Sequence, residues 1–280
     1  MLYEIRHLTE YTYSAPVTLE PQRLLLLPID SPAMRVVSHQ FHISPTPDGE
    51  SIILDAFNNR VGMAWFTGRS STLRIESVSV VEPRDHNPFN FLVYPVECSY
   101  LPMIYPADTN RWLDIYRPPG HFSEAVTSFA QRVQNETGGQ TVNFLSGLCA
   151  RIARDIAYER REKGLPREPD ETLSLGSGAC RDLAVLFMAA ARATGLAARY
   201  ASGYVLGHDL LSERELHAWA EVYVPGAGWI GFDPVLGLVT SNDHVVVAVA
   251  PIPTATAPVQ GLYRGDATAG LHYRIDVRML

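Results

Sequence analysis

Residues 176–195 read GSGACRDLAVLFMAAARATG, and this stretch predicts how the second half of the chain folds. Its leucine, phenylalanine and alanine residues recur at steps of three and four, the spacing that buries one face of a helix. Glycines precede Cys180, and Gly195 suits the left-handed conformation that often ends a helix. We therefore predict a helix that begins near Cys180 and ends before Gly195.

Strands are predicted on the C-terminal side of this helix, in short runs of β-branched, aromatic and small apolar residues at 198–205, 217–224 and 228–232. Helices are predicted on its N-terminal side, at 122–133 and 141–157, from apolar residues at helical spacing. Helices followed by a set of antiparallel strands indicate an α+β fold, because alternating βαβ units would place a helix between successive strands.

The first hundred residues predict a second, strand-rich domain. Short extended runs separated by turn residues occur at 36–43, 51–54, 62–66 and 73–80. This spacing predicts an antiparallel, β-sandwich-like N-terminal domain. We place that domain at residues 1–105 and a catalytic domain at residues 106–280, with a final strand at 271–280 that is able to pack back on the N-terminal domain.

Composition excludes several classes of protein. The chain has 280 residues, a formal net charge of −7 and 46% hydrophobic residues, enough for a buried core. An acidic balance without a dense Lys/Arg run argues against a nucleic-acid partner. No apolar run reaches membrane-spanning length, so no membrane partner is expected. The first 16 residues lack the apolar core of a signal peptide, which predicts a cytoplasmic location. The sequence does not specify an oligomeric state.

The three cysteines differ in their surroundings. An odd number of cysteines argues against a disulfide framework. Cys149 falls on the apolar face of a predicted helix, and Cys98 lies in a proline-rich connector without a basic neighbour. Cys180 opens a helix, where unpaired N–H groups and the positive end of the helix dipole favour the thiolate, and Arg181 follows it. Cys180 is therefore the candidate nucleophile.

His217 and Asp233 complete a candidate triad with Cys180. The strands that carry His217 and Asp233 are joined by a tight glycine-containing turn, so a hairpin would bring the two residues together at its open end. A carboxylate that accepts from one imidazole nitrogen leaves the other nitrogen to take the thiol proton. Trp219 shares the strand face of His217, and we expect this face to line a cleft whose rim is the polar segment 207–215.

Four motifs extend the argument beyond single residues. They read GSGACRDLA at 176–184, RYASGY at 199–204, HAWAEVY at 217–223 and GWIGFDP at 228–234. Together, and in this order of Cys, His and Asp, they resemble the core of the transglutaminase-like superfamily. The N-terminal stretches IRHLTEYTYSAP at 5–16 and PQRL at 21–24 resemble the β-rich leader domain of the bacterial branch of that superfamily.

The resemblance implies a papain-like core in which Cys180 forms a thioester with an acyl donor. His217 would act as the base and then the acid, and Asp233 would orient its ring. The backbone N–H of Cys180 would hold part of the oxyanion. Trp219 and Tyr204 fall inside the resembling motifs and are the predicted substrate-binding residues, with packing in the core or in the cleft wall as their alternative role. No metal and no cofactor are expected, and the predicted partner is a peptide or protein substrate.

The predicted activity is hydrolysis of amide bonds by a cysteine protease or amidase. The calcium-dependent animal transglutaminases carry Gln before and Trp after the cysteine, where this chain has Ala179 and Arg181. Three alternatives remain at this point: a transglutaminase that transfers the acyl group to an amine, a non-catalytic binding module with the same fold, and a zinc hydrolase with the triad residues as ligands.

Overall fold

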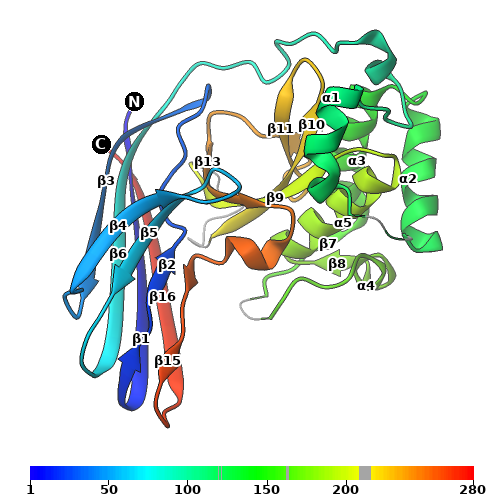
Figure 1. Ribbon diagram of the computed structural model, residues 1–280. Helices are drawn as coiled ribbons and strands as arrows, with labels where there is room; N and C mark the ends of the chain where they lie inside the picture. Colours follow the sequence, from blue (N-terminus) through cyan, green and yellow to red (C-terminus); the bar gives the residue numbers. More distant parts are fainter. Residues whose placement is uncertain (119, 121, 162–163, 208–215) are drawn as a thin grey trace.

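The computed structural model describes residues 1–280 except 119, 121, 162–163 and 208–215. Three layers lie side by side: an N-terminal β-sandwich, a central antiparallel sheet, and helices on the far side of that sheet (Figure 1). The predicted α+β fold, with a strand-rich N-terminal domain before a sheet covered by helices, is confirmed.

The N-terminal β-sandwich consists of two antiparallel sheets. Six strands come from the first part of the chain: β1 (Tyr3–Leu19), β2 (Gln22–Leu24), β3 (Met34–Ser44), β4 (Gly49–Leu54), β5 (Arg60–Trp65) and β6 (Ser70–Pro83). Three come from the last part: β14 (Val259–Gln260), β15 (Tyr263–Arg264) and β16 (Ala269–Met279). One sheet has the order β15-β1-β6-β3 with β16 also on β1, and the other has the order β14-β2-β5-β4. Because β16 pairs with β1 from Tyr3 to Tyr13, the two chain termini lie close together (Figure 1).

The central sheet forms the middle layer, with the order β12-β11-β10-β9-β13. Its strands are β9 (Ala198–Val205), β10 (His217–Val224), β11 (Gly228–Asp233), β12 (Leu238–Val239) and β13 (His244–Ala250). The bounds of β9 and β10 are those that the sequence predicts. Strand β13 was not predicted, and it pairs with β9 on the side opposite β10.

Helices cover one face of the central sheet. They are α2 (Glu124–Glu136), α3 (Thr141–Asp155), α4 (Pro169–Leu175) and α5 (Cys180–Ala193). Shorter helical pieces elsewhere in the chain are η1 (Val96–Ser99), α1 (Ala107–Asn110), η2 (Arg111–Tyr116) and η4 (Pro253–Thr256). The two-residue strands β7 (Ala157–Tyr158) and β8 (Ser177–Gly178) pair with each other. The Ser123 side chain caps α2 by accepting from the Val126 N–H at 3.2 Å. Phe187 of α5 stacks on Phe232 of β11 with ring centroids 5.4 Å apart, so α5 packs directly against the sheet.

The N-terminal domain covers the other face of the central sheet. The buried Asn59 side chain donates to the Val249 carbonyl and accepts from the Val249 N–H, both at 2.8 Å, which joins the β-sandwich to β13. Leu25 and Val61 pack against Ala248 of the same strand. Both faces of the sheet are therefore buried, and the face of β10 that carries Trp219 is not the cleft wall that alternation predicted.

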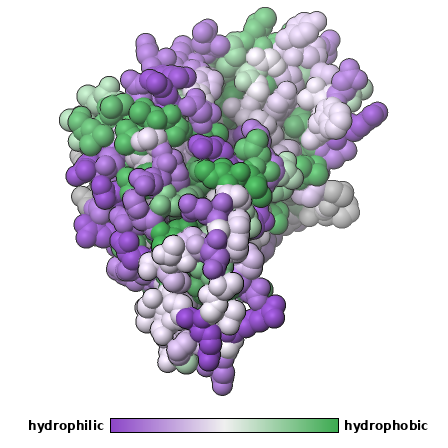
Figure 2. Space-filling view, turned by 60° about the vertical axis from the view of Figure 1, so that its left-hand side comes forward, coloured by the Kyte–Doolittle hydropathy of each residue, from purple (hydrophilic) through white to green (hydrophobic). Residues whose placement is uncertain are grey.

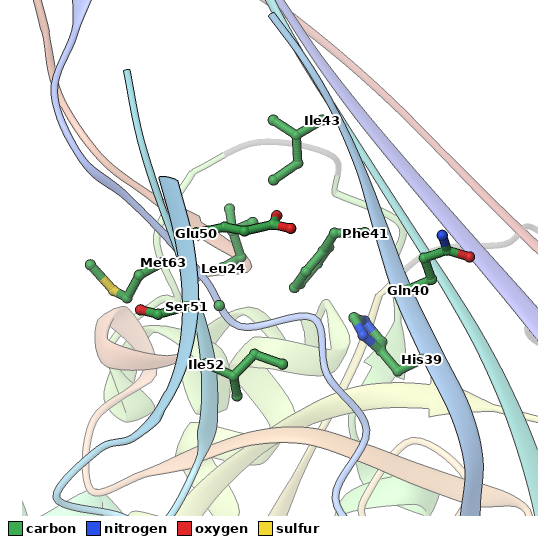
Figure 3. A pocket seen from close by; sticks show the side chains of 10 residues that line it. Leu24, His39, Gln40, Phe41, Ile43, Glu50, Ser51, Ile52 and Met63 are labelled. Carbon is green, nitrogen blue, oxygen red and sulfur yellow. The ribbon is translucent and has the colours of Figure 1, made fainter. Parts of the chain in front are cut away.

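A groove of about 400 Å³ lies between the two sheets of the N-terminal domain. His39 and Phe41 point into it from β3, opposite Leu24 of β2 and Ile52 of β4 (Figure 3). Strand β4 is an edge strand with exposed apolar side chains, and Figure 2 shows hydrophobic patches on this side of the molecule. No cysteine occurs among the described residues that line the groove, so the candidate active site lies elsewhere.

Candidate active site

The structure brings Cys180, His217 and Asp233 together. His217 begins β10 and Asp233 ends the antiparallel neighbour β11, so both lie at the same edge of the central sheet. The His217 Nε2–H donates to Asp233 Oδ2 at 2.7 Å. The Cys180 thiol lies close enough to the His217 ring to raise the pKa of that ring, and Nδ1 is the ring nitrogen that Asp233 does not use. This is the order of contacts that a thiol, a base and an orienting carboxylate require.

Asp182 holds the start of α5 in place. Its buried carboxylate accepts from the Ala179 N–H at 2.8 Å and from the Arg167 N–H at 2.8 Å, and it pairs with Arg161. A Cβ on Gly178 would lie 2.9 Å from Asp182 Cβ, so this close approach requires glycine. Cys180 is therefore fixed as the first residue of the helix, where backbone N–H groups have no partner within the helix.

Buried charges fix the protonation of the pair formed by His217 and Asp233. Burial alone would lower the pKa of His217, but the Asp233 carboxylate and the Cys180 thiol outweigh burial and raise that pKa to about 10. Burial would raise the pKa of Asp233, but His217 and His244 outweigh it and hold that pKa well below its usual range. At neutral pH the ring is therefore an imidazolium and Asp233 a carboxylate.

His244 is a fourth polar residue of the site, and the sequence analysis missed it. It begins β13, which runs parallel to β10 on the other side of β9, so it lies at the same sheet edge as His217. His244 Nε2 bonds Asp233 Oδ2 at 3.1 Å and its Nδ1 bonds Asp243 Oδ1 at 2.7 Å. Burial lowers the pKa of His244, but the two carboxylates outweigh it and raise that pKa. A ring that donates to carboxylates from both nitrogens is positively charged.

A continuous chain of hydrogen bonds runs from His217 through Asp233 and His244 to Asp243, and the Cys180 thiol lies beside the His217 end of it. The remaining oxygen of Asp233 accepts from the backbone N–H of Val235 at 2.9 Å and of Leu236 at 3.3 Å. Every polar atom of the Asp233 carboxylate is thus bonded, and the carboxylate has one fixed orientation for His217.

Trp219 and Tyr204, the predicted substrate-binding residues, lie behind the site. Trp219 is 0% exposed and Tyr204 is 2% exposed, and neither lines the cleft beside Cys180. The Trp219 ring meets the edge of His244 with centroids 5.2 Å apart, above Gly203, where a Cβ would lie 2.8 Å from the Trp219 ring. Strand alternation for Trp219 and motif position for Tyr204 predict a role at the substrate, but neither pattern shows which side chains the fold buries. We correct their role to packing behind the site.

The other two thiols are enclosed. Cys98 and Cys149 are fully buried, whereas Cys180 is partly exposed. Burial raises the pKa of both enclosed thiols. The Cys149 thiol donates to the backbone carbonyl of Asp233 at 3.2 Å, so it supports the strand end that carries the carboxylate.

A cleft of about 350 Å³ gives access to Cys180 and His217. The core contributes Tyr200 and Ser202 to its lining, and the N-terminal domain contributes residues of β1 and β16. The predicted rim at 207–215 lies, apart from Gly207, outside the described residues. Within the described part of the chain, no group of three His, Cys, Asp or Glu side chains is arranged to hold a metal ion, and no helix is long and apolar enough to cross a membrane.

Comparison with known proteins agrees with this architecture. Residues 3–82 match the model of the bacterial transglutaminase-like N-terminal region, and residues 127–234 match the model of the transglutaminase-like superfamily. The chain belongs to the transglutaminase-like superfamily. That superfamily includes cysteine proteases and transglutaminases, and the resemblance stated from the sequence motifs is confirmed.

Two relatives and one solved structure extend over nearly the whole chain. An uncharacterized protein of Mycobacterium tuberculosis is 28% identical over 290 residues, which cover 98% of this chain and 92% of that protein. An uncharacterized protein of Mycobacterium leprae is 23% identical over 283 residues, covering 98% of this chain and 97% of that protein. The structure of a candidate cysteine protease from Cytophaga hutchinsonii matches with a TM-score of 0.70 at 17% identity, covering 100% of this chain and 91% of that one. The shared fold therefore includes the N-terminal domain as well as the core.

Proposed function

We propose that the protein is a cysteine amidohydrolase that cleaves a peptide amide bond through a thioester on Cys180. The observation that carries the proposal is the accessible cleft lined by both Cys180 and His217, with the His217 ring hydrogen-bonded to Asp233. A partly exposed thiol at a helix start, beside an imidazole held by a carboxylate, is the arrangement of an activated nucleophile.

The proposed reaction begins with attack of the Cys180 sulfur on the amide carbonyl carbon after its proton has passed to His217. The carbonyl oxygen becomes an oxyanion, for which the backbone N–H groups at the start of α5 are the available donors. His217 then gives its proton to the amide nitrogen, the C–N bond breaks, and the amine leaves. A water molecule gives a proton to His217 and attacks the thioester carbonyl, which releases a carboxylic acid and restores the thiol.

Asp233 and His244 are positioning residues in this proposal. Asp233 holds the His217 ring in the tautomer whose free nitrogen faces the sulfur, and it stabilises the imidazolium. His244 keeps Asp233 ionised and fixed by donating to the same oxygen. A cytoplasmic location belongs to the proposal as well, because reducing surroundings keep a reactive thiol free.

The test is product analysis of a peptide library incubated with the protein, with and without a primary amine. We expect new free carboxylates in both incubations, and no product with Cys180→Ala. Cys98→Ala, which removes an enclosed thiol of the same chemistry, should leave the products unchanged. Amine adducts in place of free acids would instead identify a transglutaminase, and the absence of any product from the intact chain would favour a binding module.

A further inference from the structure

The N-terminal domain supplies one wall of the cleft that leads to Cys180. The wall consists of His7, Thr9 and Tyr11 from β1 and Leu271 and Tyr273 from β16, which we call the N-terminal wall. Alternate residues of β1 share one face of the sheet, and the strand register places Thr9 opposite Tyr273 and Tyr11 opposite Leu271. The five side chains therefore form one continuous surface that faces the core.

The N-terminal wall is fixed relative to the catalytic residues. A hydrogen bond of 2.9 Å joins His7 Nδ1 to the hydroxyl of Tyr204 on β9, the strand between His217 and His244. Ile5, the preceding residue on the same face of β1, is buried in one apolar cluster with Tyr204 and Val247. A group bound against the wall is thus held at a constant place relative to the sulfur.

The accessible part of the N-terminal wall is uncharged. Burial lowers the pKa of His7 to about 4, so this ring is neutral at pH 7. Leu271 is 58% exposed and Tyr273 is 37% exposed, so an apolar and an aromatic side chain are within reach of a bound molecule.

The described residues that line the rest of the cleft offer no carboxylate to a cationic group. Its described lining contains no aspartate or glutamate, and most of the cleft surface is apolar. Arg161 and Arg181 line the cleft, and the Arg161 guanidinium is bonded to Asp182 and to the Leu165 carbonyl. A cationic substrate group would therefore lose its hydration without gaining a carboxylate from the described lining.

We propose that the N-terminal wall selects the substrate, and that it selects peptides whose acyl group beside the scissile amide is an uncharged apolar or aromatic residue. This inference rests on the proposed function, because it takes Cys180 as the atom that reacts with the selected group. A cleft of about 350 Å³ has room for a side chain and its neighbouring backbone and none for a folded loop. The substrate is thus a short or extended segment of peptide.

The test measures the rate at which peptidyl vinyl sulfones label Cys180 when Phe, Glu or Lys stands beside the electrophile. This labelling requires no catalytic turnover. We expect the wild-type protein to react with the Phe probe at least about tenfold faster than with either charged probe. Leu271→Glu places a carboxylate on the wall at an exposed position. It should slow the Phe probe and make the Lys probe faster than the Glu probe.

The matched control is Leu54→Glu, which adds the same charge to an exposed leucine of β4 that does not line the cleft. Its order of probe rates should equal that of the wild type. An unchanged order in Leu271→Glu, equal rates for all three probes in the wild type, or preference for the Glu probe would overturn the proposal. Selective labelling without cleavage of any amide would refute the proposed hydrolase and leave the N-terminal wall as the selecting surface. Amide cleavage with unselective labelling would support the hydrolase and refute selection by the N-terminal wall.

Discussion

Asp233→Asn is the substitution with the largest expected electrostatic effect on the site. The Asp233 carboxylate raises the pKa of His217 to about 10 against a burial effect that lowers it. An amide has nearly the same shape without the charge, so burial then dominates and the pKa should fall to about 6.5 or below. A fall of about 3.5 pH units corresponds to ~5 kcal/mol at 1.36 kcal/mol per unit. Peptide cleavage should fall by about a thousandfold or more and leave residual activity, as in other triads that lose tautomer control.

The assay is NMR titration of the histidine ring nitrogens between pH 6 and 10, with His217→Gln to assign the signal among the nine histidines of the chain. In the wild type the His217 ring should stay protonated well above pH 8. In Asp233→Asn it should be neutral at pH 8. If the two proteins titrate His217 alike, the carboxylate is not what charges the ring, and the electrostatic account of the site is wrong.

Three further predictions follow from the same contacts. His244→Gln loses one of two hydrogen bonds to carboxylates and should lower the free energy of unfolding by about 1.5–3 kcal/mol in urea titrations. His39→Gln changes a half-buried ring that is hydrogen-bonded to the neutral Ser77 hydroxyl, so it should cost less, and equal losses would count against a charged His244. The pKa of His217 is raised on folding, so the contribution of this residue to stability is complete below about pH 6.5 and is lost as the pH rises through about 10. The difference in free energy of unfolding between wild type and Asp233→Asn should therefore shrink from pH 7 to pH 10. A constant difference would contradict this prediction. Gly203→Ala places a Cβ 2.0 Å from the Val245 carbonyl, so the melting temperature should fall sharply, and an unchanged value would show that β9 and β13 separate at little cost.

Local patterns in the sequence were sufficient to predict the core of the site. The run after Cys180 has helical spacing, and the turn between β10 and β11 fixes the hairpin that brings His217 to Asp233. These are contacts between neighbours in the chain, so short-range rules describe them. The catalytic roles of the three residues stay predictions, since geometry alone does not measure turnover.

His244 was missed because β13 was missed. Residues 244–250 read HVVVAVA after the turn residues Ser241 to Asp243, which is the pattern of a buried strand and was a usable signal. Nothing local shows, however, that this strand crosses to the far side of β9 and starts at the same sheet edge as β10. The place of His244 beside Asp233 depends on that long-range pairing.

The exposure of Trp219 was predicted wrongly for a related reason. Alternation along β10 correctly separates its two faces, but it does not say what covers each face. Contacts such as Asn59 with Val249 place the N-terminal domain over Trp219, and they join residues 190 positions apart. The packing of the N-terminal domain on the central sheet also brings β1 and β16 to the cleft, so short-range rules could not predict the N-terminal wall.

The most direct test of the account is the rate at which iodoacetamide alkylates each of the three cysteines, followed by peptide mapping at pH 6.5. The account predicts that Cys180 reacts far faster than Cys98 and Cys149, and that His217→Gln slows Cys180 by at least about tenfold, because the thiolate loses its positive partner. The His217→Gln variant is needed because the greater exposure of Cys180 would by itself make Cys180 react faster than the two buried thiols. An unchanged rate in His217→Gln, or equal labelling of the three thiols, would contradict the claim that Cys180 and His217 form a reactive pair.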